Sequence, residues 1–235
     1  AWLGTIAYTI QLFFDFSGYT DMAIGLALMI GFVFPQNFND PYTSKSITEF
    51  WQRWHMSLSS WLREYLYIPL GGNKKGTRRT YINLFLTMLL GGLWHGANWT
   101  FVVWGAWHGG ILAIERYLKS KFGDSILPSW LRIIKTMLLV MIGWIFFRAI
   151  DLNNALQMLR GLIGLNGFNF SNMMEWQIEP DRLGILFVAI FLVYAMPWLH
   201  RYRGGPMRYL LIPLFFWAVA TLSAQNFTPF LYFQF

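Results

Sequence analysis

His95 is the residue whose type and surroundings point most directly to chemistry. It lies in a glycine-rich segment, Gly-Gly-Leu-Trp-His-Gly at residues 91–96, which interrupts an apolar run over residues 81–118. A neutral imidazole can take a proton from a hydroxyl or carry an acyl group transiently, and burial favours the neutral form. The chain has no cysteine and no Ser-His-Asp spacing, so His95 is its best candidate for a general base. The alternative is that His95 only hydrogen-bonds a neighbouring helix.

The composition indicates that membrane helices position this histidine. Of the 235 residues, 56% are hydrophobic and 12% are charged, whereas soluble domains carry about 25% charged residues. The 13 Trp residues fit a membrane protein because Trp gathers at the membrane–water interface. The net charge of +7 comes from short basic clusters between apolar runs, so no nucleic-acid partner is expected. With no cysteine, disulfides and thiolate nucleophiles are excluded, and no metal site is predicted.

Residues 1–34 are predicted to form two helices, or one broken helix, that meet at Ser17-Gly18. Asp15 and Asp21 lie in this apolar stretch, where an unpaired carboxylate is costly. The simplest expectation is an ion pair with Arg53, Arg63 or Arg148. The alternatives are that the carboxylates orient an imidazole or bind a cation.

Residues 46–70, after a loop at residues 35–42, are predicted to form an amphipathic helix in the membrane interface. Aromatic and aliphatic side chains recur there at helical spacing, with charged residues between them. Ser46 and Glu49 have the spacing of a capping box at its start. Trp51, Trp54 and Trp61 form a stripe that is expected to anchor the helix at the membrane surface.

Basic loops predict how the chain crosses the membrane. After a basic loop at residues 71–79, the run over residues 81–118 must turn back on itself, and residues 131–147, 183–199 and 209–223 are each predicted to span. Residues 151–182 form a polar loop that is poor in Lys and Arg and is expected outside. The basic clusters that mark the cytoplasmic side are Lys74, Lys75, Arg78 and Arg79, then Arg116, Lys119, Lys121, Arg132 and Lys135, then Arg201, Arg203 and Arg208.

This topology predicts the depth of His95. It lies 14 residues past Tyr81, or about 21 Å along a helix, past the middle of a hydrocarbon core about 30 Å thick. Broken backbone at that depth is tolerated only inside protein or beside a wet cavity. We therefore expect an imidazole at a helix break that can be reached from both faces of the membrane.

Several blocks along the chain resemble the membrane-bound O-acyltransferase family, in the branch that contains the alginate O-acetyltransferases. They occur in the family's order, from one end of the chain to the other, at residues 14–22, 50–59, 65–73, 91–109 and 232–235. The resemblance implies an all-α polytopic membrane protein, a ring of tilted transmembrane helices with re-entrant or interfacial helices. It also implies that residues 1–235 are the C-terminal part of a single membrane domain, with N-terminal helices absent.

By the same resemblance, His95 corresponds to the family's catalytic histidine and His55 to an accessory one. His55 is expected to position the acyl donor or a carbonyl, because Arg53 is nearby. Arg53, Trp94 and Asn98 are predicted to bind substrate. No cofactor is expected to stay bound, and the acyl donor is expected to be acetyl-CoA or another acyl thioester, whose phosphates the basic loop at residues 71–79 could attract.

The function implied is transfer of acetyl from a cytoplasmic donor across a bacterial inner membrane, toward O-acetylation of an exported polysaccharide such as alginate. The expected partners are membrane lipid and a periplasmic acetyltransferase. Two alternatives stay open: D-alanyl transfer to teichoic acid, as in a related branch, and a transporter or flippase, suggested by Asp15, Asp21 and His95 in broken helices. His108 is expected to pack inside the protein and His200 to lie at the surface.

Overall fold

The computed structural model describes residues 1–167, 179–199, 209 and 211–224, and the regular elements in these ranges are helical. The all-α class predicted from the sequence is therefore confirmed for this part of the chain. The predictions for His200, for the basic cluster at residues 201–208 and for the motif at residues 232–235 lie outside the described residues. The helices are α1 (Trp2–Met29), α2 (Ile47–Arg53), α3 (Met56–Leu62), α4 (Thr77–His95), α5 (Trp99–Phe122), α6 (Ser129–Arg148), α7 (Leu152–Leu162), α9 (Pro180–Leu199) and α10 (Leu211–Ala224), with a 3-10 turn at Pro41–Thr43 and a π-helical turn at Arg63–Tyr67.

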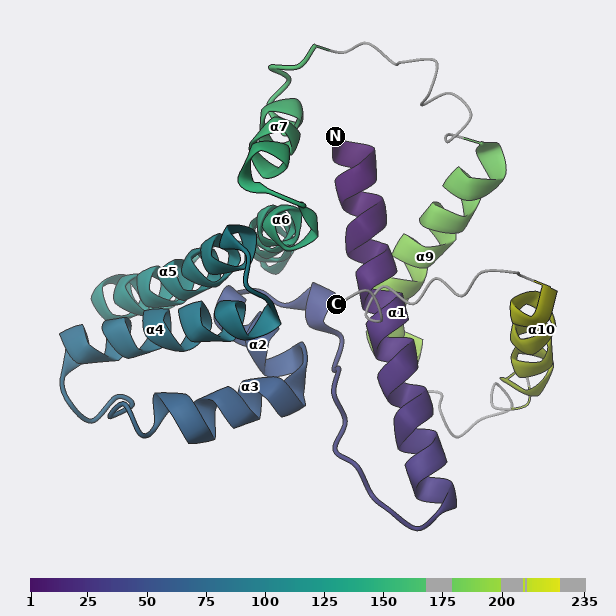
Figure 1. The fold of residues 1–235 in the computed structure, drawn as a ribbon, viewed down its shortest axis with the longest axis horizontal. Helices are drawn as coiled ribbons and strands as arrows, with labels where there is room; N and C mark the ends of the chain where they lie inside the picture. The colour runs from purple at the N-terminus through teal and green to yellow at the C-terminus, as the bar shows by residue number, and fades with distance from the viewer. Residues whose placement is uncertain (168–178, 200–208, 210, 225–235) are drawn as a thin grey trace.

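Helices α4 and α5 form an antiparallel hairpin whose backbones touch (Figure 1). A Cβ atom at Gly92 would lie 2.3 Å from the carbonyl oxygen of Phe101, and one at Gly105 would lie 2.4 Å from that of Met88. Only glycine fits such an approach, as is common where membrane helices pack. The hairpin therefore depends on glycines that face the partner helix.

The break between these helices was predicted at residues 91–96, and it lies slightly later. Helix α4 continues through Gly91 and Gly92 and ends at His95, and the turn comprises residues 96–98. Gly91 and Gly92 are buried in the helix, so their role is close packing rather than interruption of the helix. The prediction that His95 stands at a helix break is confirmed.

Helix α1 is continuous over 28 residues, so the predicted break at Ser17-Gly18 is wrong. A helical Gly costs only about 1 kcal/mol, and burial of Phe13 and Phe16 on the same helix outweighs that cost. The predicted ion pair of Asp15 with an arginine is also wrong within the described residues, where Oδ2 of Asp15 is buried without a hydrogen-bond partner.

The single interfacial helix predicted for residues 46–70 is instead two short helices, α2 and α3, and a π-helical turn at Arg63–Tyr67 continues α3. His55 separates them with a left-handed backbone, φ 46° and ψ 55°. The preceding loop bonds both sides of the break, because the amide of Asn39 donates to the carbonyl of Arg53 and the amide of Met56 donates to the carbonyl of Asn37. These long-range bonds compete with the helical ones and end α2.

The predicted capping box is confirmed at the start of α2, with one difference. Oγ of Ser46 accepts from the amide of Glu49 at 3.0 Å. The Glu49 carboxylate accepts from the amide of Lys45 at 2.7 Å, one residue before the amide that a standard capping box uses.

Helices α6 and α9 are each 20 residues long and apolar enough to span a membrane, as predicted. Helix α10 has 14 residues, within one residue of the length of the predicted segment 209–223, and at about 21 Å it is shorter than a hydrocarbon core about 30 Å thick. The polar loop predicted for residues 151–182 contains α7, which begins where Oδ1 of Asp151 accepts from the amide of Asn154. The side-chain cap stabilises the start of this helix by about 1 kcal/mol, and burial of Ala155 adds packing against the rest of the protein.

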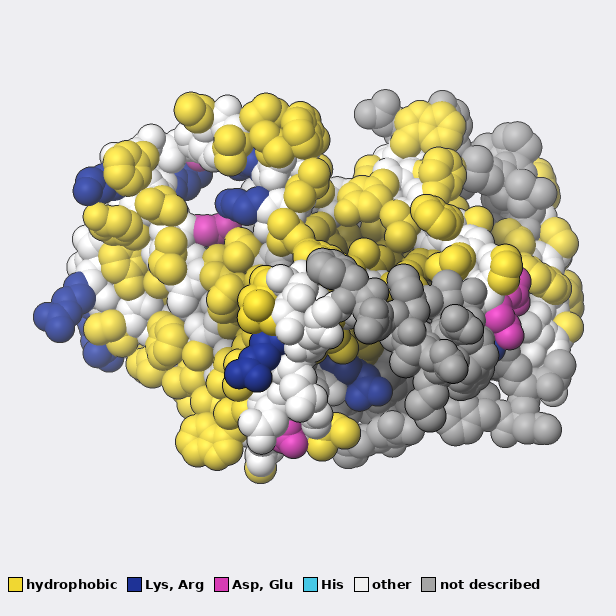
Figure 2. Space-filling view, turned by 90° about the horizontal axis from the view of Figure 1, so that it is seen from above, with side chains coloured by type: hydrophobic (Ala, Val, Ile, Leu, Met, Phe, Trp, Pro, Cys, Tyr) yellow, Lys and Arg dark blue, Asp and Glu magenta, His cyan; other side chains and the backbone are white. Residues whose placement is uncertain are grey.

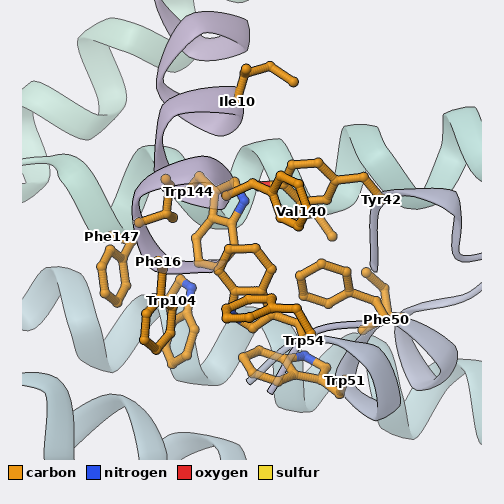
Figure 3. Close-up of a cluster of buried hydrophobic side chains, with 14 of the residues drawn as sticks. Ile10, Phe16, Tyr42, Phe50, Trp51, Trp54, Trp104, Val140, Trp144 and Phe147 are labelled. Atoms are coloured by element: carbon orange, nitrogen blue, oxygen red, sulfur yellow. The ribbon is translucent and has the colours of Figure 1, made fainter. Parts of the chain in front are cut away.

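Aromatic side chains dominate the core that these helices enclose (Figure 3). Trp51 and Trp54 belong to this core, with 8% and 3% of their surface exposed, so their predicted role as interfacial anchors is wrong. Only Trp61 of that stripe is largely exposed, at 53%. The break at His55 redirects α3, so the three tryptophans no longer share one face.

Apolar side chains cover much of the face seen in Figure 2, and charged side chains are scattered among them. The basic residues of the first two predicted clusters lie at the open end of the α4–α5 hairpin and at the start of α6. The two clusters therefore occupy the same end of the molecule, as the topology prediction requires. His95 lies at the other end of α4.

Candidate active site

A small cavity brings His55 and His95 together. Side chains from six helices, α1 to α6, line this cavity, and α4 contributes its last residue, His95. Trp54 and His55 come from the break between α2 and α3. The space suffices for about one water molecule. The lining residues are Leu12, Trp51, Trp54, His55, Leu58, His95, Trp104, Trp144 and Phe147.

His95 stands in an aromatic frame at the end of α4. Its ring centroid lies 5.1 Å from that of Trp104 and 5.1 Å from that of Phe147, both in edge-to-face geometry, and 5.0 Å from that of Trp94. The side chain is partly exposed rather than sealed in. Within the described part of the chain, no hydrogen bond holds the imidazole, so its nitrogens are available to a bound group. A ring nitrogen that is free to accept a proton is what a general base requires.

His55 enters the cavity from the break between α2 and α3. Its left-handed backbone is uncommon for a non-glycine residue, and such strain is often found at functional sites. The centroids of the Phe16 and His55 rings are 4.7 Å apart, and the two rings are perpendicular. Burial, and secondly the nearby His95, lower the pKa of His55 to about 4. His55 is therefore a neutral imidazole at pH 7.

His108 is fully buried and does not line the cavity. Its Nδ1 accepts a hydrogen bond from Nε1 of Trp51 at 3.3 Å. On its other side Nε2 faces Gly143 so closely that a Cβ atom there would lie 2.4 Å away. His108 thus holds the cavity-lining Trp51 from behind, which is a packing role.

The three residues predicted to bind substrate lie around the cavity and not in its lining. Arg53 forms an ion pair with Glu49 and donates to Oγ1 of Thr43. Trp94 packs beside His95 but is 65% exposed. Asn98 caps α5, since its Oδ1 accepts from the amide of Thr100 at 3.1 Å, and its Nδ2 donates to the carbonyl of Ile150 at 2.8 Å. A contact of Arg53, Trp94 or Asn98 with substrate stays a prediction.

The sequence analysis did not predict the aromatic side chains that line the cavity, or the hydrogen bonds that position α2 beside them. Trp104, Trp144 and Phe147 come from helices remote from His55 in sequence, and only the spacing of Trp144 and Phe147 on one helix face hinted at them. Glu115 of α5 was also missed. Its carboxylate accepts from the amides of Ile47 and Thr48, each at 3.0 Å, and so fixes the start of α2.

Comparison with known proteins identifies the family. The profile of the membrane-bound O-acyltransferase family matches residues 1–158. The chain belongs to the membrane-bound O-acyltransferase family. The matched residues include His55, His95 and the described helices that line the cavity, so the cavity is part of the family's shared domain. Membership of a membrane-bound family agrees with the apolar helices α6 and α9.

Similar proteins include acetyltransferases and D-alanyltransferases. The chain is 46% identical over its whole length to a probable alginate O-acetylase AlgI of Azotobacter vinelandii and 43% identical over 84% of its length to a peptidoglycan O-acetyltransferase of Helicobacter pylori. It is 37% identical over 48% of its length to a teichoic acid D-alanyltransferase of Bacillus subtilis. It spans 54% of the first of these relatives, 38% of the second and 30% of the third.

Proposed function

We propose that this O-acyltransferase chain acts in a full-length protein that moves acetyl from a cytoplasmic thioester, such as acetyl-CoA, toward O-acetylation of an exported polysaccharide such as alginate. The observation that carries the proposal is the aromatic cavity in which His55 and His95 meet. The protein would lie in the bacterial inner membrane and pass the acetyl group to a periplasmic acetyltransferase.

His95 would act as the general base. As the acceptor oxygen attacks the thioester carbonyl, the hydroxyl proton moves to the imidazole, and the new C–O bond forms. The C–S bond then breaks, and the thiolate recovers the proton from the imidazolium. The aromatic rings around His95 leave room for about one water molecule, which limits hydrolysis of the thioester.

The relatives favour acetyl over the alternative acyl group. Identity to the probable alginate O-acetylase extends over 100% of the chain, whereas identity to the teichoic acid D-alanyltransferase covers 48%. A transporter would need a passage that a solute can enter. The cavity beside His95 has room for about one water molecule, which suits proton transfer better than solute passage.

The test is His95→Ala in the full-length protein. Loss of a general base typically lowers the rate about 10²–10⁴-fold, so the acetyl content of the exported polysaccharide should fall to background. The amount of protein in the membrane should stay normal, because the ring makes no hydrogen bond to the described residues. His200→Ala serves as a matched control and should keep full acetylation, since the sequence places His200 in a basic stretch.

Each alternative has its own outcome in the same strains. Normal acetylation by His95→Ala would contradict the catalytic role. Loss of solute uptake with intact acylation would support a transporter. D-alanine on the exported polymer in place of acetyl would assign the chain to the D-alanyl branch.

A further inference from the structure

Asn37 determines which nitrogen of His55 carries the hydrogen. Oδ1 of Asn37 lies 3.2 Å from Nδ1 of His55, 3.2 Å from the backbone nitrogen of Ser57 and 3.0 Å from Oγ of Ser57. A backbone amide can only donate, so the atom that it meets must be the side-chain oxygen of Asn37 and not the nitrogen. Oγ of Ser57 also lies 3.4 Å from Nδ1 of His55, but its one hydrogen is donated to Oδ1 of Asn37. An amide oxygen only accepts, so Nδ1 of the neutral His55 ring donates to Asn37. Nε2 is then left with its lone pair.

The same residue holds the backbone that aims His55. The carbonyl of Asn37 accepts from the amide of Met56 at 2.9 Å, directly after the left-handed residue. Asn37 is itself 7% exposed, and the Phe16 ring of α1 packs perpendicular to the imidazole. Contacts from α1 and from the segment between α1 and α2 thus constrain the backbone, ring plane and tautomer of His55.

We propose that Asn37 is a positioning residue of the acyl-transfer site, which holds His55 as a hydrogen-bond acceptor in the cavity beside His95. The inference rests on the proposed O-acyltransfer function. With its one hydrogen committed to Asn37, a neutral His55 cannot donate to a carbonyl from Nε2. The role predicted from the sequence, positioning a carbonyl, is therefore replaced by acceptance of a hydrogen bond from a substrate N–H or O–H group other than the hydroxyl that His95 deprotonates.

A tautomer measurement tests this geometry without a catalytic readout. The full-length protein is labelled with ¹⁵N-histidine, reconstituted in lipid nanodiscs and studied by NMR, with His55 assigned as the signal lost in His55→Gln. The expected result is a protonated Nδ1 and an unprotonated Nε2 in the wild type, and loss of this preference in Asn37→Ala. A protonated Nε2 in the wild type, or an unchanged tautomer in Asn37→Ala, would overturn the proposal.

A rate–pH profile then separates positioning from a structural role. Asn37→Ala should lower acyl transfer about 10–100-fold at every pH, as loss of a residue that orients a functional imidazole does. Asn37→Asp keeps an acceptor in place and adds a negative charge, which raises the pKa of the imidazole. Because the acceptor imidazole must be neutral, the acid limb of the Asn37→Asp profile should move to higher pH, with activity recovered on the alkaline side. His95 is the titratable group that acts on His55 among the described residues, and it is present in both variants.

The control is Asn39→Ala, two residues along the same segment. The side chain of Asn39 is exposed, and its one described bond uses the backbone amide, which alanine keeps. This variant should match the wild type. Rates are expressed per folded protein, measured by thermal unfolding of each variant.

The outcomes distinguish the two proposals. Equal loss in Asn37→Ala and Asn37→Asp at every pH would refute positioning while O-acyltransfer stands. Absence of acyl transfer in the wild type would refute the proposed function, and the tautomer result would stand on its own.

Discussion

Gly105→Ala should destabilise the protein by forcing α4 and α5 apart. The added Cβ atom would lie 2.4 Å from the carbonyl oxygen of Met88 and 2.9 Å from Cα of Leu89, both backbone atoms that cannot rotate away. An ordinary carbon–oxygen contact is about 3.3 Å or longer, so the helices must separate by about 1 Å. Overpacking of this kind costs about 1–3 kcal/mol.

Gly110→Ala is the matched control on the same helix. Nothing lies within 4 Å of its added Cβ atom, and replacing a helical Gly with Ala favours the helix by about 1 kcal/mol. Gly105 lies in the same helix and gains the same propensity term, so the unfolding free energies of the two variants should differ by the overpacking cost, about 1–3 kcal/mol. Unfolding of the purified protein in mixed detergent micelles, followed by Trp fluorescence, gives both values.

The separation should also reach the site, because Trp104 lies next to Gly105 and frames His95. Gly105→Ala should therefore lose acyl transfer as well as stability, whereas Gly110→Ala keeps both. Equal stability of the two variants would refute the reasoning, since it would show that the hairpin does not depend on backbone contact at Gly105.

Two further predictions concern the positioning of α2 and the protonation of His55. Glu115→Ala removes the carboxylate that accepts from two amides at the start of α2 and should lower the unfolding free energy by about 2–3 kcal/mol. The control, Asp124→Ala, removes an exposed ion pair with Lys119 and should leave the melting temperature unchanged. An equal effect of the two variants would contradict the capping role of Glu115. Because burial lowers the pKa of His55 from the ordinary 6.5 to about 4, the unfolded chain binds more protons between these values, so stability should fall as the pH drops from about 6.5 to about 4. His55→Gln should flatten this part of the stability–pH curve, and an unchanged slope would show that His55 titrates freely in the folded protein.

The sequence correctly predicted the local features of the site. The glycine-rich segment predicted that His95 stands at a helix break, and α4 ends at that residue. The capping box at Ser46 predicted the start of α2 correctly, although the distant Glu115 also stabilises that turn. Both depend on neighbours within a few residues, where glycine freedom and short polar side chains act directly on the backbone.

Errors arose where distant segments decide the local conformation. Helix α1 passes through Ser17-Gly18 without a break because its apolar face is packed against the core. The break at His55 depends on hydrogen bonds from Asn37 and Asn39. Neither packing nor long-range hydrogen bonds can be seen in a pattern of periodicity, which describes one helix in isolation.

The sequence by itself determined the class of the protein, the apolar helices and the histidine at the turn, because composition, hydrophobic length and glycine content are properties of single segments. Only the tertiary structure decided that His55 meets His95, that Trp51 and Trp54 build the cavity rather than anchor the surface, and that Asn37 sets the hydrogen of His55. The physical reason is that these features require side chains from several helices to meet, and the packing of α1, α4, α5 and α6 fixes where they do.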